Sequence, residues 1–215
     1  MNVSLRVVGL GGSLAERSTS LAALRIALSG AQEAGAETQL IDIKRLNLPM
    51  YRPQETNVPD GAWEFCEAMY SAHGLLWSSP LYHGTVSGAF KNALDWLHLL
   101  INRDPPYLSD KVIGLISTAG GVQGLQAVNT MEFAVRALRG WAVPMVLPIP
   151  RAWQAFDEAD QPKDPSVAEQ LRGLGREVVR AARQLATLGY CDYSQPHPET
   201  LLTAAADHAA RPPQG

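Results

Sequence analysis

A Gly-Gly-Ser turn followed by three further hydroxyl residues is the stretch of this chain best suited to bind a small anion. It reads GGSLAERSTS and offers Ser13, Ser18, Thr19 and Ser20 between a short apolar run and a helical pattern. Hydroxyl groups and the free backbone amides at a helix N-terminus donate hydrogen bonds to an anion such as phosphate. We therefore predict a phosphate site in this loop, with Arg17 as its nearby cation.

Two further loops follow short apolar runs in the same way. One reads SPLYHG over residues 79–84, and the other reads TAGGVQG over residues 118–124. A loop that follows a buried strand of an α/β sheet lies at the strand's carboxyl end, which is where such sheets bind their ligands. Three such loops on neighbouring strands meet in one crevice, and this convergence is the main sequence argument for a binding site.

Hydrophobic periodicity predicts the elements that position these loops. Short apolar runs predict five strands, at residues 5–10, 38–42, 74–78, 112–117 and 142–147. Apolar residues at steps of three and four predict helices at residues 19–34, 60–73, from after residue 88 to residue 100, 125–139 and 165–188.

Two of these helices allow their buried faces to be predicted. In the helix that ends at residue 100, the expected buried residues are Phe90, Ala93, Leu94, Leu97 and Leu100. On its other face, Lys91 should pair with Asp95, and Asn92 and Asp95 should hold the backbone of the preceding loop. In the helix at 125–139, the expected buried residues are Leu125, Val128, Val135 and Leu138.

Strands that alternate with helices predict an α/β fold, a doubly wound five-stranded parallel sheet with helices on both faces. In the flavodoxin-like order 2-1-3-4-5, strands one, three and four are adjacent at the centre of the sheet, so their loops meet. We expect one domain over residues 1–188. Residues 189–215, rich in Pro and Ala, should form a C-terminal tail that is partly disordered or docked.

Composition narrows the function classes. The chain has 215 residues, a formal net charge of −3 and scattered Lys and Arg, which argues against nucleic-acid binding. Cys66 and Cys191 form no CxxC motif, so neither a metal site nor a dithiol redox site is indicated. No leader segment or membrane-spanning run is recognisable, and we expect a cytoplasmic protein with no membrane partner.

Two nucleotide-binding fingerprints are absent from the first loop. A dinucleotide fingerprint needs GxGxxG, but Leu14 stands in the third glycine position, and a P-loop needs a Lys that does not follow these glycines. Asp42 ends the second predicted strand, where a dinucleotide-binding protein holds its ribose. Without the fingerprint, we expect Asp42 to be a helix cap or a loop anchor.

At this point a family resemblance becomes specific. The stretch GGSLAERSTSLA resembles the phosphate loop of NAD(P)H-dependent FMN reductases, whose pattern is roughly GSLRxxSxS or GSLRxxSxN. SPLYHGTVSGAFKNALDWL is similar to that family's P-x-Y-x-G-x-x-x-G-x-x-K-N-A-x-D-W, and STAGGVQG to its third flavin loop; LPMY at 48–51 and AFDEADQPKDP also look familial. One position departs from the pattern, since Ala15 replaces the usual arginine.

The resemblance implies a role for each loop. The residues that it places at the FMN phosphate are Ser13, Arg17, Ser18, Thr19 and Ser20. The residues that it places along the isoalloxazine, largely through backbone amides, are Pro80, Leu81, Tyr82, His83 and Gly84. Those that it places beside the pyrimidine are Thr118, Ala119, Gly120 and Gly121. Tyr82 has a second interpretation as a packed aromatic residue, and His83 is expected to give shape to its loop rather than donate a proton.

The resemblance also implies an activity and partners. FMN would carry a hydride from NADPH or NADH to an electron acceptor such as free flavin, a quinone, an azo dye or a metal oxyanion, with ping-pong kinetics. The enzyme would be a homodimer or homotetramer with the flavin near a subunit interface. The sequence supports this through an apolar and aromatic excess at Trp96, Leu97, Leu99, Leu100 and Trp141.

Two alternatives stay open at this point. A non-enzymatic, flavodoxin-type electron carrier would use the same fold, but such carriers are usually strongly acidic and this chain has 18 basic against 21 acidic residues. A serine hydrolase would use Ser13, because GGSLA is one residue away from GxSxG. Its base would be His83, His197 or His208.

Overall fold

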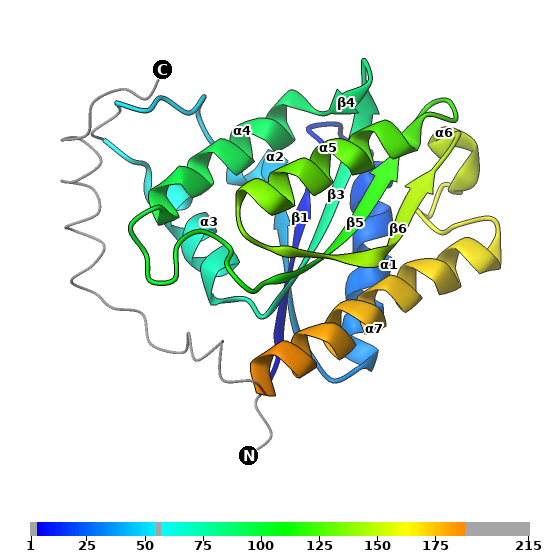
Figure 1. The fold of residues 1–215 in the computed structure, drawn as a ribbon. Coiled ribbons are helices and arrows are strands. Elements are labelled where there is room, and N and C mark those ends of the chain that lie inside the picture. Colours follow the sequence, from blue (N-terminus) through cyan, green and yellow to red (C-terminus); the bar gives the residue numbers. More distant parts are fainter. Residues whose placement is uncertain (1–3, 55–56, 188–215) are drawn as a thin grey trace.

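The computed structural model describes residues 4–54 and 57–187, which form one sheet with helices on both sides (Figure 1). The sheet has the order β2-β1-β3-β5-β6, with β4 paired to β3. Its parallel strands are β1 (Arg6–Gly11), β2 (Glu37–Asp42), β3 (Gly74–Tyr82), β5 (Val112–Thr118) and β6 (Trp141–Ile149). With β4 set aside, this is the predicted flavodoxin-like order, so the predicted fold class is confirmed.

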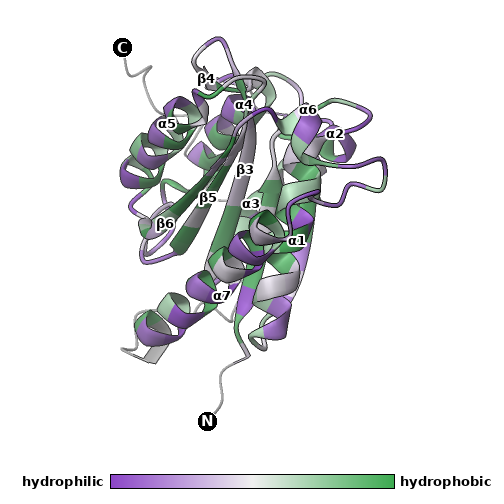
Figure 2. Ribbon diagram, turned by 90° about the vertical axis from the view of Figure 1, so that its right-hand side faces the viewer, coloured by the Kyte–Doolittle hydropathy of each residue, from purple (hydrophilic) through white to green (hydrophobic). Residues whose placement is uncertain are grey.

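The helices cover both faces of the sheet, which explains why its central strands are apolar on both sides. The face toward which Val8 and Trp77 point is covered by α3 (Asp60–Ser71), α4 (Gly88–Trp96) and α5 (Gly124–Ala137). The face toward which Val7 and Leu76 point is covered by α1 (Thr19–Glu33) and α7 (Pro165–Thr187). Figure 2 shows this layering as hydrophobic strands between helices whose outer faces are hydrophilic.

Three short helical elements complete the described chain. They are α2 (Ile43–Leu46), the 3-10 helix η1 (Leu97–Leu100) and α6 (Ala152–Ala155). No helix within residues 4–54 and 57–187 is both long and apolar enough to cross a bilayer. The predicted tail at 189–215, with Cys191, His197 and His208, lies outside the described residues.

Helices α1 and α7 pack with their backbones in direct contact. A Cβ on Gly175 would lie 1.9 Å from the Ala27 carbonyl oxygen, and a Cβ on Gly30 would lie 2.1 Å from the Arg172 carbonyl oxygen. Real Cβ atoms do not approach that closely, so only glycine fits at these two positions. The helix that follows the first loop is thereby held against the last helix of the fold.

The third predicted strand was too short. β3 continues to Tyr82, so Pro80, Leu81 and Tyr82 belong to the strand rather than to a loop. The chain then reverses through His83 and Gly84, with φ of 48° and 85°, into the antiparallel strand β4 (Thr85–Val86). Proline is tolerated here because the pairing with β1 ends at Ser78, so at Pro80 the strand β3 has only β5 beside it and behaves as an edge strand.

The predicted buried set of the helix ending at residue 100 is confirmed, whereas one predicted buried residue of α5 and most of the residues offered for a subunit interface were placed wrongly. Leu125 is 52% exposed because it stands in the first turn of α5, at the open edge of the sheet. Among the apolar residues offered for a subunit interface, Trp96, Leu97, Leu99 and Leu100 are buried in this chain's own core. Only Trp141 of that group is exposed.

Candidate functional site

The three sequence-predicted loops meet at one edge of the sheet (Figure 1). The register pairs Gly11 at the end of β1 with Ser78 of β3, and Pro80 of β3 with Thr118 at the end of β5. The first loop is fixed to the second directly, since the Gly12 amide donates to the Ser78 carbonyl oxygen at 2.8 Å. The predicted convergence at the carboxyl ends of adjacent strands is therefore present.

The hydroxyl groups of the first loop surround the N-terminus of α1. Ser18 is the N-cap, and its Oγ accepts a hydrogen bond from the Leu21 amide at 3.1 Å and lies 3.0 Å from the Ser20 Oγ. The Ser13 Oγ accepts from the Ala15 amide at 3.2 Å. The helix itself cannot satisfy the amides of Thr19 and Ser20 in its first turn. These donors and the positive end of the helix dipole suit a phosphate group.

Small residues let these backbones approach one another. A Cβ on Gly12 would lie 2.8 Å from Phe90 of α4 and 3.0 Å from the Ser78 carbonyl oxygen, and a Cβ on Gly11 would lie 2.7 Å from Leu21. A larger residue at Gly12 would push the first loop away from the second. The two glycines thus let the first loop lie directly against β3 and α1, and we call this close-packed turn the glycine cradle.

Three buried serines that the sequence analysis did not single out lock the cradle. Ser87 is the N-cap of α4, and its Oγ accepts from the Phe90 amide at 3.0 Å and donates to the Gly12 carbonyl oxygen. The Ser79 Oγ accepts from the Ser87 amide at 3.1 Å, and the Ser78 Oγ donates to the Ser20 carbonyl oxygen at 2.8 Å. These contacts join β3 to both neighbouring loops. Their sequence signal is three serines that directly flank the proposed flavin wall.

The second loop forms a narrow hairpin beside the cradle. Its Tyr82 side chain is 52% exposed, so the interpretation of this residue as a packed core aromatic is wrong. His83 takes a left-handed conformation at the tip, which suits the predicted role of giving the loop its shape. Pro80 is buried near the end of β3, and Leu81 is half-buried and packs against the core.

The third loop presents free backbone to the same crevice. Thr118 and Ala119 are buried, whereas Gly120 and Gly121 are exposed, and a Cβ on Gly120 would meet no atom within 4 Å. The loop is fixed by its other groups, since the Ala152 amide donates to the Ala119 carbonyl oxygen at 2.9 Å. In the part of the chain that the structure describes, neither glycine amide donates a hydrogen bond, so both remain available to a ligand.

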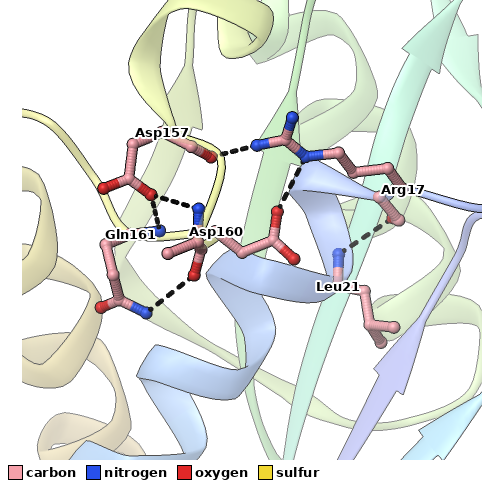
Figure 3. A network of polar contacts seen from close by, with 7 residues as sticks. Arg17, Leu21, Asp157, Asp160 and Gln161 are labelled. Atoms are coloured by element: carbon pink, nitrogen blue, oxygen red, sulfur yellow. Dashed lines mark hydrogen bonds and ion pairs between the residues drawn. The ribbon is translucent and has the colours of Figure 1, made fainter.

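Arg17 reaches outward from the first loop and fastens it to a distant segment (Figure 3). Its Nε lies 3.2 Å from the Asp160 Oδ1, and its guanidinium also donates to the Asp157 carbonyl oxygen. The Asp157 carboxylate in turn accepts from the Gln161 amide at 2.9 Å. The cation expected at the phosphate therefore links the start of the chain to the segment before α7.

The most recognisable sequence motif supports a neighbouring segment. Asn92 accepts from the Tyr51 amide at 2.8 Å and donates to the Pro49 carbonyl oxygen at 2.9 Å, so it holds residues 49–51 and not the loop before its helix. The expected Lys91–Asp95 pair is present at 2.5 Å. Burial, together with the nearby Asp95, raises the pKa of Tyr51 to about 12, which keeps its phenol neutral.

Two expectations about single residues can be compared with these contacts. Asp42 caps α2, its Oδ1 accepting from the Lys44 amide at 3.0 Å, as predicted. The hydrolase alternative is not supported, because no histidine among the described residues contacts the Ser13 hydroxyl. Within the same residues, no group of three metal-ligating side chains is present.

The donor set of this crevice fits a phosphorylated planar cofactor. One end offers hydroxyl groups and helix amides, the middle offers Pro80 and the exposed Tyr82 ring, and the far end offers the amides of Gly120 and Gly121. Exposed apolar side chains, Leu14, Val122 and Trp153, stand around it. A flavin mononucleotide has the same sequence of phosphate, apolar ring and polar ring edge.

Comparison with known proteins gives the same picture. The family model described as NADPH-dependent FMN reductase matches residues 5–154. The chain is 28% identical over 206 residues to the NADPH-dependent FMN reductase ArsH of Shigella flexneri, covering 96% of this chain and 76% of that protein. It is 36% identical over 154 residues to an NADPH:quinone oxidoreductase of Arabidopsis thaliana, covering 63% of this chain and 76% of that protein.

A solved structure with a similar fold is RosB, which holds an intermediate described as 8-demethyl-8-formylriboflavin-5'-phosphate. It superposes with a TM-score of 0.70 at 16% identity, covering 95% of this chain and 87% of that one. At this identity the likeness concerns the fold alone.

Proposed function

Since the chain belongs to the family of NADPH-dependent FMN reductases, we propose that it holds FMN in the crevice between its three loops and transfers reducing equivalents from NADPH to a small-molecule acceptor. The observation that carries this proposal is the convergence of the loops, locked by the glycine cradle and the buried serines. When bound, FMN supplies the hydride and electron chemistry, so no nucleophile or metal is required of the chain.

The phosphate is assigned to the first loop. Ser13, Ser18 and Ser20 would offer hydroxyl donors, and the amides of Thr19 and Ser20 would complete the site at the positive end of α1. Arg17 stands on the same loop with its guanidinium turned to Asp160, so we assign it mainly to holding the loop closed. A phosphomonoester carries nearly two negative charges at neutral pH, which several neutral donors can hold.

The ring is assigned to the second and third loops. Pro80, Leu81 and Tyr82 would form one wall, and the turn at His83 and Gly84 would set its shape. Thr118 and Ala119 would support the edge formed by Gly120 and Gly121, whose amides would stabilise negative charge that develops on the pyrimidine side, as an oxyanion hole does.

The acceptor and the assembly are proposed from the surroundings of the crevice. Relatives named as FMN and quinone reductases support free flavin or a quinone as acceptor, which would enter after the oxidised nicotinamide leaves. We propose a homodimer or homotetramer whose interface borders the crevice, because Leu14, Val122 and Trp153 are exposed there. A cytoplasmic location is proposed because the Cys66 thiol is free and buried.

A titration tests the function. Adding FMN to the purified protein should quench flavin fluorescence with a defined stoichiometry, and riboflavin, which lacks the phosphate, should bind more weakly. The loaded protein should consume NADPH when a quinone or free FMN is present, with ping-pong kinetics. A protein that binds no FMN and oxidises no NADPH with either acceptor would refute the proposal, whereas tight FMN binding without NADPH oxidation would favour an electron carrier.

A further inference from the structure

A second cavity lies next to the first loop, on the flank of α1 that faces the end of β2. Its volume is about 410 Å³, within the range typical of small-molecule sites. Leu21 and Ala22 of α1 form an apolar part of its wall, and Ser18 and Ala15 form its border with the first loop. Ser18 is the one residue of the proposed phosphate site that lines it, so the cavity is a neighbour of that site and not the site itself.

The charged residues around this cavity are nearly all paired. Lys44 Nζ lies 2.5 Å from the Glu16 carboxylate, and Arg45 Nε lies 3.8 Å from the Asp42 carboxylate. The remaining carboxylate, Asp160, is the partner of Arg17 seen in Figure 3. Each carboxylate of the cavity therefore already has a cation.

Arg25 is the exception. It projects from α1 into the cavity lining, is exposed, and makes no ion pair or hydrogen bond with any residue that the structure describes. The cavity lining holds three cations and three carboxylates, but one of these carboxylates, Asp160, is paired with Arg17, which lies outside the lining, so the charge of Arg25 is not balanced by a partner. The cavity is consequently suited to an anion.

A second cation can join Arg25. The Glu16 side chain that holds Lys44 is 93% exposed, so this pair gains little from its geometry and exchanges easily for a stronger anion. Ala15 brings only a methyl group to the same lining, in which both Arg25 and Lys44 take part. An incoming dianion can therefore contact Arg25 and Lys44 together.

We propose that this cavity binds the 2′-phosphate of NADPH, and that Arg25 and Lys44 are the residues that make the enzyme prefer NADPH over NADH. The inference rests on the proposed function, which places the nicotinamide over the crevice at the same edge of the sheet. Asp42 at the end of β2 lines the cavity, and β2 lies two strands from β3 in the sheet, so a dinucleotide with its nicotinamide over the crevice can reach the cavity with its adenosine half. NADPH carries a phosphate, with nearly two negative charges, where NADH carries a neutral 2′-hydroxyl group. Arg25 and Lys44 would attract this phosphate and gain nothing from the hydroxyl group, which would make the enzyme prefer NADPH.

Binding of 2′,5′-ADP and of 5′-ADP tests the proposal without any redox reaction. Calorimetry on the purified chain, with and without added FMN, should show that 2′,5′-ADP binds more tightly by on the order of 10- to 100-fold, the range expected for hydrogen bonds to charged groups. In Arg25→Gln and Lys44→Gln this preference should shrink, and in the double variant it should vanish while 5′-ADP binding stays the same. The ratio of KM for NADH to KM for NADPH should fall in parallel.

The matched control is Arg136→Gln, an exposed arginine at the far end of α5, which should keep the full preference. Equal binding of the two probes by the wild type would overturn the proposal, as would a preference that survives in the double variant. FMN affinity, measured separately in the same variants, should be unchanged. A loss of FMN affinity in these variants would overturn the proposal too, because the cations would then bind the FMN phosphate. A wild type that binds no FMN but still prefers 2′,5′-ADP would count against the proposed function alone.

Discussion

Thr19 is the residue at which the phosphate assignment can be tested with least damage to the fold. It is the first residue of α1 and is only half-buried, unlike its buried neighbours Ser18 and Ser20. An acidic residue in the first turn of a helix is favourable for the helix dipole, by about 0.3–1 kcal/mol. A carboxylate at Thr19 should therefore be tolerated by the protein and repelled only by an anionic ligand.

Thr19→Glu should lower FMN affinity by on the order of tenfold or more, because a like charge would stand beside the phosphate. Fluorescence titration measures this, and riboflavin, which has no phosphate, should lose little affinity. Thr19→Gln, whose side chain has the size of glutamate without its charge, should bind FMN nearly as tightly as the wild type. Equal FMN affinity in the Glu and Gln variants would remove the phosphate from this loop.

His73 makes the stability of the fold depend on pH. Burial, with Lys111 and Arg6 nearby, holds the pKa of His73 below its ordinary value of 6.5. Its Nδ1 accepts a hydrogen bond from the Arg6 amide at 3.1 Å, which requires the unprotonated nitrogen. Because the unfolded chain takes up this proton more readily than the folded one, the free energy of unfolding should fall as the pH drops through about 6.5 toward 5.

Urea unfolding at several pH values measures that dependence. His73→Gln should be less stable than the wild type at pH 8 and should lose less further stability between pH 7 and pH 5. An identical slope in the variant and the wild type would show that other groups cause the decline.

At the scale of elements, the contact between α1 and α7 makes a sharp prediction. Gly175→Ala should destabilise the fold by about 1–3 kcal/mol, because the new methyl group overlaps the Ala27 carbonyl oxygen and the helices must separate. Gly173→Ala, two residues earlier on α7, is the matched control, since a Cβ there has no atom closer than 3.8 Å. That variant should be neutral or stabilising by about 0.5–1 kcal/mol. Thermal unfolding of both variants decides the point, and equal midpoints would contradict the close packing.

An element could be predicted where its hydrophobic pattern along the sequence agrees with its surroundings in the fold. The central strands β1, β3 and β5 were recognisable because both of their faces are buried, so each reads as a short apolar run. The end of β3 was missed because Pro80 looks like a loop marker, although proline is accepted where a strand has a neighbour on one side only, as β3 does beyond Ser78. Leu125 was misplaced because periodicity cannot reveal that the first turn of a helix faces an open crevice.

Of the candidate site, the loops could be predicted from the sequence, whereas the side-chain contacts between elements could not. Glycine and hydroxyl patterns mark turns and helix starts, so the first and third loops were found from local chemistry. The interlocking of Ser78, Ser79 and Ser87 could not be found, because each bond crosses from one element to another. The same holds for Arg17, whose partner Asp160 is 143 positions away.

For the whole molecule, cofactor binding and folding should be coupled. A ligand that binds only the folded chain stabilises it by about 2.7 kcal/mol at 100 times its Kd, which for a chain of this size corresponds to a rise of roughly 5–10 °C in Tm. FMN at that excess should produce such a shift in differential scanning fluorimetry read from intrinsic tryptophan emission, and equimolar riboflavin a smaller one. No shift with FMN, at a concentration that saturates the titration, would mean that the bound flavin does not depend on the folded crevice.

The bridge from Arg17 to the segment at 157–161 has a consequence for protein synthesis. A nascent chain that has emerged as far as the start of α5 carries all three loops, yet Asp157 and Asp160, the partners of Arg17, follow only after β6 and α6. The contacts of Arg17 form only when Asp157 and Asp160 have been translated and lie against the first loop. A product truncated before residue 157 therefore carries every loop motif but lacks the partners of Arg17.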